Sequence, residues 1–370
     1  MLTKKICFAE AVALILILII NRIILGLPKS ILVNSAASAG FIVILVGIFS
    51  VLVVWLVNYL FQKFVASDIL DVSEFLAGKW LKVLVGILYI LMFIGISILC
   101  LSYICDVLKS IYFENFNKLF LALFFIVGII IANRIGFNAI LRTNYRIVIA
   151  TTIMFVFMLL LSSKLFVPER FFPLFGYGVK GNLWQELTDL FAFSGLSYIM
   201  LIFPFFKDTK EFYKSNLVAT ILLSIYLLMS CLGLLFVFPN LVASESIFNI
   251  YILGRLIHLS QYLQNTDSIY LLFWVLSVFS YLSINVFFIT YLFQKITNSK
   301  NTTGSLYAFC QIILASILLI DNITAYHNLL NSVYKYYMIF VIACSILILL
   351  LANMKKKKVP ISSVSKEASL

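Results

Sequence analysis

Long apolar segments, separated by short polar ones, follow one another along almost the whole chain. A helix needs about 20 predominantly apolar residues to cross a membrane. On that criterion the sequence predicts ten transmembrane helices, over 7–33, 38–62, 80–106, 117–133, 144–166, 184–206, 215–238, 268–294, 304–321 and 334–353. The pattern therefore predicts an all-α membrane protein.

Two of these segments, the first and the sixth, contain polar and helix-breaking residues at matching places. The interruptions run over Asn21–Pro28 and Gly195–Pro204, and the gap from Asn21 to Pro28 equals that from Ser197 to Pro204. Pro28 and Pro204 are expected to end half-helices. Hydrocarbon tolerates broken helices only where protein or a cavity satisfies the freed backbone groups. Paired interruptions in two halves of a chain are typical of a transporter-type binding site near the bilayer midplane.

Composition and charge agree with a membrane protein. The chain is 63% hydrophobic and 11% charged, whereas soluble domains have about 25% charged residues. The net charge of +12 lies in short loops and in Lys355–Lys358, as expected for topology and lipid headgroups and not for nucleic-acid binding. Most of the 27 Lys and Arg residues lie inside if both termini are cytoplasmic, which is the orientation we predict.

In that orientation the first five and last five helices run in opposite senses, as a 5+5 inverted repeat requires. We expect one transmembrane domain over 1–353, with repeat one at 1–166, an outer connector at 167–183 and repeat two at 184–353, followed by a basic cytoplasmic tail at 354–370. Amphipathic segments at 68–76 on the inside and 250–259 on the outside are predicted to form surface helices, with Ser73 as a possible cap of the inner one.

Several short motifs recur in an order that suggests a family. They are Asn21–Pro28, Gly78-Lys79-Trp80, Phe193-x-Gly195 with 203–208, Gly254–Ile257, Asp267–Ile269 and Phe273-Trp274. The chain thereby resembles the GerAB-type spore germination proteins, the membrane B subunits of nutrient germinant receptors and a branch of the amino acid–polyamine–organocation transporter superfamily. The resemblance implies ten helices in the fold first seen in the leucine transporter, with broken helices 1 and 6.

The resemblance also implies partners and a place in the cell. B subunits work beside a membrane A subunit and a lipoprotein C subunit in the spore inner membrane of endospore-forming bacteria, and their ligands are small nutrients, often amino acids. Superfamily members usually have a glycine-rich first break, where backbone amides meet a ligand carboxylate. Here Asn21 and Arg22 stand at that position, which puts direct transfer of a family ligand in doubt.

Arg22 lies deep in the first apolar segment, where an arginine costs at least about 2.5–3.5 kcal/mol to insert. One hypothesis is that its guanidinium binds the carboxylate of a ligand through two hydrogen bonds. The alternative, which we favour slightly, is an internal ion pair with Glu10, Glu186 or Asp189, or an outward-reaching side chain.

The other candidate ligand-binding residues are small or polar. Gly195 would let a ligand approach the backbone, while Ser194 and Ser197 would bond a ligand or their own helix carbonyls. Asn21 would offer its amide to a ligand or cap a half-helix. Asn285 forms a polar patch with Ser280 and Ser283, for which hydrogen bonding between helices is the favoured explanation.

The remaining polar residues suggest no chemistry. Asp106 and Asp321 lie at the outer membrane boundary and are expected to be solvated. The six cysteines lack metal-ligand spacing and are expected to be small buried apolar residues. We predict no catalytic residues, no cofactor and no metal site.

Three functional hypotheses remain. In the first, which we prefer, the chain is a ligand-sensing receptor subunit. In the second, it is an ion- or proton-coupled transporter of amino acids or polyamines. In the third, it is a structural membrane subunit without a small-molecule site.

Overall fold

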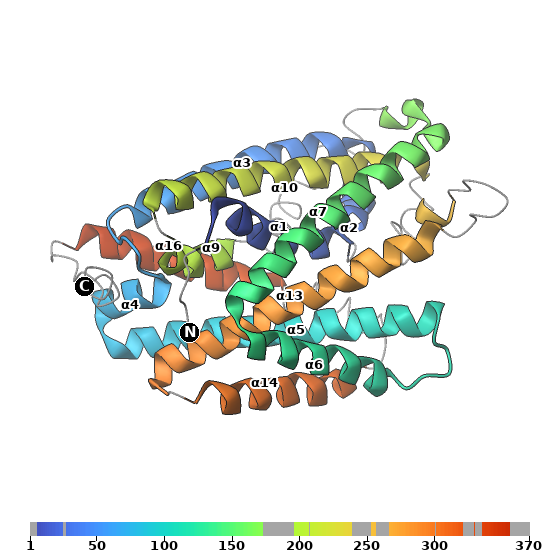
Figure 1. Ribbon diagram of the computed structural model, residues 1–370. Coiled ribbons are helices and arrows are strands. Elements are labelled where there is room, and N and C mark those ends of the chain that lie inside the picture. The colour runs from blue at the N-terminus through green and yellow to red at the C-terminus, as the bar shows by residue number, and fades with distance from the viewer. Residues whose placement is uncertain are drawn as a thin grey trace.

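The computed structural model describes residues 6–24, 27–172, 196–206, 208–238, 253–256, 266–299, 301–320, 329 and 335–355. Within these ranges the chain forms helices and one isolated β-bridge, between Ile6 and Phe206. The long helices lie side by side in an elongated bundle (Figure 1).

Eight helices within the described ranges are long and apolar enough to cross a membrane. These helices are α3 (Ala39–Phe61), α5 (Lys79–Ile111), α6 (Lys118–Ile135), α7 (Phe137–Ser162) with η2 (Ser163–Leu165), α10 (Thr209–Val237), α13 (Thr266–Thr297), α14 (Thr302–Ser316) with η5 (Ile317–Leu319), and α16 (Lys335–Met354). They coincide in order and approximate position with eight of the ten predicted segments. For the other two predicted segments, the first and the sixth, the described residues form only shorter helices.

The first predicted segment is divided into two helices, α1 (Phe8–Ile24) and α2 (Leu27–Ser35), followed by η1 (Ala36–Ser38). Pro28 was expected to end a half-helix. Instead it lies in the first turn of α2, where its missing N–H removes no intrahelical hydrogen bond. The described part of this segment thus consists of two helices, and proline lies at the beginning of the second one and not at the end of the first.

The sixth predicted segment is described from Leu196 onwards. It contains the short helix α9 (Leu196–Ile202) and η4 (Phe203–Phe205), with Pro204 at the end of the helix, as expected. Residues 184–195 of this segment lie outside the described ranges.

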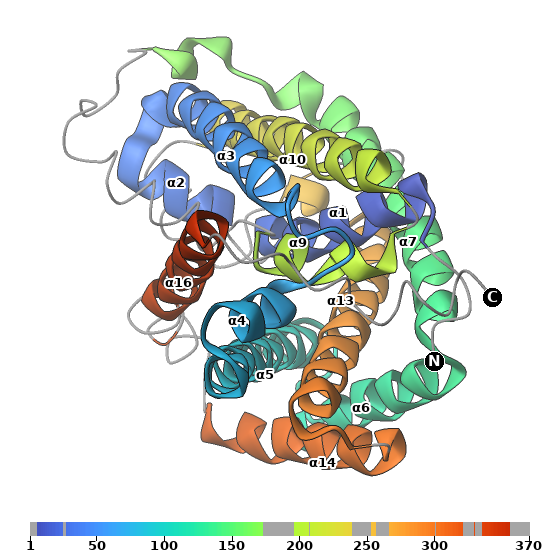
Figure 2. The same cartoon turned by 90° about the vertical axis from the view of Figure 1, so that its left-hand side faces the viewer.

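The interrupted helices α1 and α9 occupy the middle of the bundle. Seen along the bundle, they are surrounded by the longer helices (Figure 2). Ile17 and Ile20 of α1 and Ile202 of α9 are completely buried. A helix that is apolar on all sides belongs in a protein interior, so composition and position agree.

The outward faces of the surrounding helices carry large apolar side chains at helical spacing. On α3 they are Phe41, Leu45, Ile48, Leu52, Trp55 and Tyr59, and on α6 they are Phe120, Phe124, Val127 and Ile131. Apolar surface of this extent on a single chain faces lipid when the helices also have membrane-spanning length. The chain is therefore an integral membrane protein.

The predicted inner amphipathic helix is α4 (Ile69–Ala77), but its cap differs from the prediction. Asp68, not Ser73, is the N-cap, because its Oδ1 accepts hydrogen bonds from the backbone N–H groups of Leu70 and Asp71, both at 3.0 Å. Asp71 accepts in return from the Asp68 N–H at 3.2 Å, which completes a capping box. Ser73 lies inside α4 and donates to the Leu70 carbonyl at 2.7 Å.

The two predicted outer surface segments are described only in part. The connector is described as far as Phe172, where η3 (Pro168–Phe171) is held to α10 by hydrogen bonds from the Val167 N–H and the Arg170 guanidinium to the Phe236 carbonyl, at 3.1 and 2.9 Å. Of the amphipathic segment 250–259, only 253–256 fall within the described ranges. The six cysteines, all within the described ranges, form no disulfide with one another; four of them are buried, as predicted, while Cys7 is exposed and Cys344 half-buried.

Candidate functional site

Asn21 lies four residues before the division between α1 and α2 and joins α1 to α13. Its Nδ2 donates to the carbonyls of Ile17, at 2.9 Å, and Ser277, at 3.2 Å. The Ser277 hydroxyl donates back to Asn21 Oδ1 at 3.1 Å. Both N–H groups of the Asn21 amide are therefore used, and the side chain is completely buried.

Tyr198 of α9 and Asn285 of α13 form a second polar group in the interior, and Ser197 precedes Tyr198 at the start of α9. The Tyr198 hydroxyl donates to Asn285 Oδ1. Asn285 Nδ2 and Ser197 Oγ are both buried and have no hydrogen-bond partner among the described residues. Ser197 and Asn285 are completely buried. An unpaired buried polar atom costs about 1–3 kcal/mol, so these two atoms call for a partner beyond the described residues.

Aromatic side chains surround this polar group. The Tyr198 ring lies 4.9 Å from the Phe93 ring and 5.6 Å from the Phe288 ring, between centroids. The Phe93 and Phe288 rings are stacked at 5.9 Å. Helices α5, α9 and α13 therefore contribute one face each to an apolar surrounding in which hydrogen bonds are strong.

Tyr89 fixes the position of α9 from the side of α5 and α16. Its hydroxyl lies 2.9 Å from Ser345 Oγ of α16 and 3.4 Å from the sulfur of Met200 in α9. The Tyr89 side chain is completely buried. One tyrosine thus connects three helices just beyond the Ser197–Tyr198 pair, which holds the start of α9 in a defined position.

This arrangement offers hydrogen bonds to a small polar molecule and no charge from the residues described here. Asn285 Nδ2 carries two donors, and Ser197 carries a hydroxyl that donates and accepts. Such groups suit a carboxylate, carbonyl or amide. Within the described ranges, no three His, Cys, Asp or Glu side chains gather where they could hold a metal ion.

The predicted site residues are brought together only in part. Ser197 precedes Tyr198 in the chain, and Asn285 accepts a hydrogen bond from the Tyr198 hydroxyl. Asn21 contacts α13 at Ser277, two helical turns away from Asn285.

The other predicted site residues are not described fully. Arg22 belongs to α1, but its side chain lies outside the described part, and Ser194 and Gly195 lie outside it altogether. Glu10 accepts a hydrogen bond from the Cys7 N–H at 3.3 Å, and Glu186 and Asp189 are outside the described ranges.

The other two residues of the predicted polar patch on α13, Ser280 and Ser283, take part in hydrogen bonds to neighbouring helices, which was the explanation favoured from the sequence. Ser280 donates to Asn144 Oδ1 of α7 at 2.9 Å. Ser283 donates to its own helix at Phe279, and its carbonyl accepts from Asn133 of α6 at 3.1 Å. Among the residues that the structure describes, Asn285 is the member of this patch that keeps an unpaired donor.

Sequence reasoning missed Tyr198 and Ser277. A signal was present, because Tyr270, Trp274, Ser277, Tyr281, Asn285 and Phe288 recur every three or four residues and therefore share one face of α13. All six are buried. Polar and aromatic residues gathered on one face of a membrane helix indicate a face turned to the interior.

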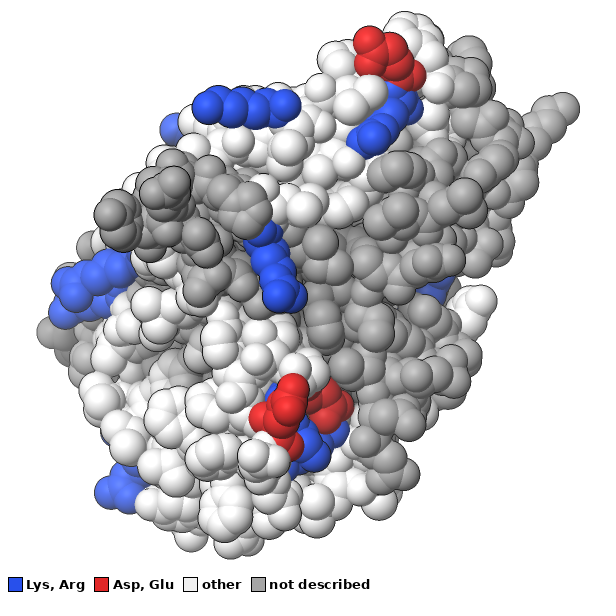
Figure 3. Space-filling model, turned by 90° about the vertical axis from the view of Figure 1, so that its right-hand side faces the viewer, with Lys and Arg blue, Asp and Glu red and all other residues white. Residues whose placement is uncertain are grey.

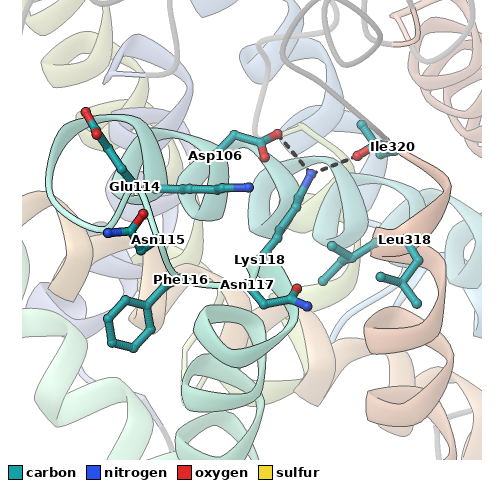
Figure 4. Close-up of a pocket in the computed structure, with 10 residues that line it drawn as sticks. Asp106, Glu114, Asn115, Phe116, Asn117, Lys118, Leu318 and Ile320 are labelled. Carbon is teal, nitrogen blue, oxygen red and sulfur yellow. Dashed lines mark hydrogen bonds and ion pairs between the residues drawn. The ribbon is translucent and has the colours of Figure 1, made fainter.

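A cavity of about 440 Å³ lies at the end of the bundle away from α4, between the ends of α5, α6 and η5 (Figure 4). Asp106 was expected to be solvated, but it forms an ion pair with Lys118 at 2.9 Å and its side chain is only 11% exposed. Lys118 also donates to Ser102 Oγ at 2.7 Å and to the Ile320 carbonyl at 2.8 Å. These three acceptors use all three protons of the Lys118 ammonium. The ion pair therefore connects α6 to α5, and the hydrogen bond to Ile320 connects α6 to the residue after η5.

Figure 3 shows this end of the molecule as a space-filling model. Among the described residues in that view, acidic side chains gather at two places, each beside basic ones. Asp321, also predicted to be solvated, lies outside the described ranges.

The fold is similar to that of solved membrane transporters. A Na⁺-coupled sialic acid symporter, in a substrate-bound outward-open state, matches with a TM-score of 0.64 and 11% identity, covering 92% of this chain and 78% of the symporter. A manganese transporter of Eremococcus coleocola, in complex with an aromatic bis-isothiourea substituted compound, matches with a TM-score of 0.61 and 13% identity, covering 95% of this chain and 79% of the transporter. At these identities the likeness concerns the fold alone.

Two proteins of Bacillus subtilis (strain 168) are similar in sequence. Spore germination protein B2 is 24% identical over 211 residues, which are 57% of this chain and 57% of that protein. Spore germination protein YndE is 23% identical over 226 residues, which are 59% of this chain and 60% of that protein. The matches therefore span less than two thirds of either relative. The family model described as "Spore germination protein" matches residues 5–327. The resemblance seen in the sequence is thereby confirmed, and the chain belongs to the spore germination protein family.

Proposed function

We propose that this protein is the membrane B subunit of a spore germinant receptor, and that it senses a small nutrient, with an amino acid as the leading candidate, in the middle of the bundle. Family membership supports the role in germination. The observation that carries the sensing role is that two buried atoms, Ser197 Oγ of α9 and Asn285 Nδ2 of α13, have no hydrogen-bond partner among the described residues.

The proposed architecture has ten transmembrane helices in a 5+5 inverted repeat of the leucine-transporter type. Eight continuous membrane-length helices support it, together with the division of the first segment into α1 and α2. The sixth segment, which ends with α9, supplies the second broken helix. The likeness to two transporter structures is consistent with this arrangement.

The proposed ligand carries a carboxylate. Two N–H donors of Asn285 and the hydroxyl of Ser197 supply hydrogen bonds to an anion, which are stronger than those to a neutral group. A full negative charge in the membrane interior also needs a cation, and Arg22, in the last turns of α1, is the residue we propose for it. Ser194 and Gly195 precede α9 and are proposed to complete the site through the hydroxyl and the exposed backbone.

Asn21 has a different proposed role from that of a direct ligand. Both N–H groups of its amide already bind carbonyls of Ile17 and Ser277. It therefore positions α1 against α13, and a ligand that shifts α1 acts on α13 through it. Ligand binding changes the equilibrium between two conformations only when the affinities for them differ.

We place the subunit in the spore inner membrane with both termini in the cytoplasm, beside an A subunit and a lipoprotein C subunit. The first and last described residues lie at the α4 end of the bundle, which is the proposed cytoplasmic end. Ile6 binds the Phe205 carbonyl at 3.0 Å, and Lys355 binds carbonyls of α4.

The test is the nutrient dose-response of spores that carry Ser197→Ala, Asn285→Ala or Arg22→Ala, with the amount of each variant measured in spore membranes. We expect Ser197→Ala and Asn285→Ala to raise the half-maximal nutrient concentration about tenfold, which corresponds to about 1.4 kcal/mol of lost binding. Arg22→Ala should abolish the response.

Ser283→Ala is the matched control. Like Ser197, Ser283 is a buried serine, but its hydroxyl donates to the Phe279 carbonyl of its own helix, α13. Its substitution should leave the half-maximal concentration within about twofold. An unchanged dose-response in Ser197→Ala and Asn285→Ala at normal protein levels contradicts the proposed site.

The second candidate function is an ion- or proton-coupled transporter of amino acids or polyamines, favoured by the fold it shares with a Na⁺-coupled symporter. Purified protein in proteoliposomes, with imposed proton and sodium gradients, distinguishes the two. Accumulation of a labelled amino acid or polyamine supports transport, whereas binding without accumulation supports a receptor.

A further inference from the structure

A lysine near the end of α13 holds two carboxylates of the α4 region. Lys295 Nζ lies 2.6 Å from Asp68 Oδ2 and 2.7 Å from Asp71 Oδ2. The Tyr291 hydroxyl, one turn earlier on α13, also donates to Asp68 Oδ2, at 2.8 Å. Asp68 therefore uses one carboxylate oxygen to cap α4 and the other to bind α13.

This four-residue group, which we call the α4 cluster, carries one negative charge more than its lysine neutralises. Asp68 has no exposed surface, and the side chains of Lys295 and Asp71 are 19% and 30% exposed. Two carboxylates that share one ammonium in a largely buried place repel each other, and such pairs take up a proton more readily than isolated carboxylates.

The other charged groups around α4 do not balance this excess. Lys82 of α5 binds Glu74 at 2.7 Å. Lys355, after α16, donates to the carbonyls of Phe75 and Leu76 at 3.0 and 2.6 Å. The neighbouring Tyr89 of α5 is a neutral phenol bonded to Ser345. Among the cations that the structure describes around α4, Lys295 is the one that contacts the carboxylates of Asp68 and Asp71.

We propose that the α4 cluster is a binding site for one proton, held on Asp71, and that this proton keeps α4 attached to α13. With the proton bound, Asp68, Asp71 and Lys295 together are neutral, and the repulsion between the carboxylates disappears. Proton loss restores the repulsion and favours the separation of α4 from α13. The proposal concerns the chain without any nutrient and does not depend on the proposed ligand site.

The pKa values of the two carboxyls support the assignment of the proton. Burial, together with the charge of Asp68, raises the pKa of Asp71 from 3.8 to about 6, against the opposing effect of Lys295. Burial alone would raise the pKa of Asp68 as well, but Lys295 and the hydrogen bonds outweigh it and lower that pKa. Asp68 therefore stays ionised while Asp71 titrates.

The direction of the effect follows from linkage. The attached state binds the proton more tightly than a state in which Asp71 is solvated and has its ordinary pKa of 3.8. Attachment is therefore strongest at acidic pH and weakens as the pH rises through the range from about 4 to about 6. Acidification should therefore keep α4 attached to α13. If protonation of Asp71 only broke its ion pair with Lys295, acidification would instead release α4.

The first test is infrared spectroscopy of the purified protein during a pH titration. We expect a carboxylic-acid C=O band that disappears with a midpoint near pH 6, the pKa of Asp71. The band should be absent in Asp71→Asn, whose amide still accepts the Asp68 N–H. It should remain in Glu74→Gln, which removes a charge from the same helix outside the cluster. A wild-type titration between pH 5 and 7 identical to that of Asp71→Asn overturns the proposal.

The second test is hydrogen exchange of the α4 amides, corrected for the intrinsic pH dependence of exchange. Between pH 5 and pH 7.5, linkage predicts about a tenfold loss of protection in wild type and in Glu74→Gln. Asp71→Asn should remain protected at both pH values. Equal losses in Asp71→Asn and wild type, or a gain of protection in wild type at the higher pH, overturn the proposal.

Discussion

Asn21 and Ser277 bind each other in both directions. Nδ2 of Asn21 donates to the Ser277 carbonyl at 3.2 Å, and the Ser277 hydroxyl donates to Asn21 Oδ1 at 3.1 Å. Both residues are completely buried. The pair therefore fixes the last turns of α1 against the middle of α13, directly before the chain is divided between α1 and α2.

Substitution of Asn21 should lower the free energy of unfolding more than substitution of Ser277. Asn21→Ala removes three hydrogen bonds and should lower the free energy of unfolding by about 1–3 kcal/mol, whereas Ser277→Ala leaves the bond to its carbonyl and should cost about 1 kcal/mol. Unfolding in mixed detergent–SDS micelles measures both. Ser230→Ala is the control, because this buried serine donates only to its own helix at Leu227. Equal losses for Asn21→Ala and Ser230→Ala would contradict a role in joining helices.

The two oxygens of Asp68 can be tested separately. Asp68→Ser keeps a helix cap but loses the bond to Lys295, whereas Asp68→Ala loses both. Because a cap is worth about 0.5–2 kcal/mol, Asp68→Ala should be less stable than Asp68→Ser by that amount. Both should be less stable than wild type, because Lys295 loses its fully buried partner. The same SDS unfolding assay, with circular dichroism for helix content, checks the order.

Lys118 should be stabilising only while Asp106 is present. Lys118→Met leaves a carboxylate that is 11% exposed without its cation, which should cost about 3 kcal/mol. The double variant Lys118→Met with Asp106→Leu removes both charges and should recover most of the loss. Lys109→Met, at an exposed lysine lining the same cavity, should change stability by less than about 0.5 kcal/mol. A double variant as unstable as Lys118→Met alone would show that the pair is not the cause.

Tyr198 and Asn285 should behave as a coupled pair. Tyr198→Phe leaves Asn285 Oδ1 without its donor, which should lower the free energy of unfolding by about 1–3 kcal/mol. In a Tyr198→Phe, Asn285→Leu variant both polar partners are replaced, and the combined loss should be smaller than the sum of the single losses. A double-mutant cycle in the same unfolding assay measures this, and additive losses would mean that the hydrogen bond contributes little.

The sequence predicted the features that depend on local chemistry. Glycine and proline close to Asn21 predicted a divided first helix, and α1 ends at Ile24 while α2 begins at Leu27. Apolar length predicted eight continuous helices to within a few residues at most ends. The position of α4 was also predicted, although its cap was assigned to Ser73. The motif Asp68-x-x-Asp71 has the spacing of a capping box and was overlooked.

Pairs between distant helices could not be predicted, because they depend on how each helix is rotated about its axis. Asp106 was predicted to be solvated because it lies at the outer membrane boundary. Its partner, Lys118, follows on the next helix, and no helical spacing connects the two. Lys295 and Asp68 are 227 residues apart. Charged residues outside the predicted spans were interpreted as topology signals, which concealed the proton site that we infer at α4.

The length of α5 makes the thickness of the bilayer a variable for this protein. Lys82 and Asp106 on α5, both held in ion pairs, are 24 residues apart, or about 36 Å along the helix axis. A typical hydrocarbon core measures about 30 Å, and the bilayer with its headgroups about 40–45 Å, so an upright α5 places both charged ends in the headgroup regions. A thinner membrane favours a tilted α5, and a thicker one favours an upright helix. Because Lys82 binds α4 and Asp106 binds α6, that tilt is transmitted to both ends of the bundle, and lipid chain length becomes a means of shifting its conformation.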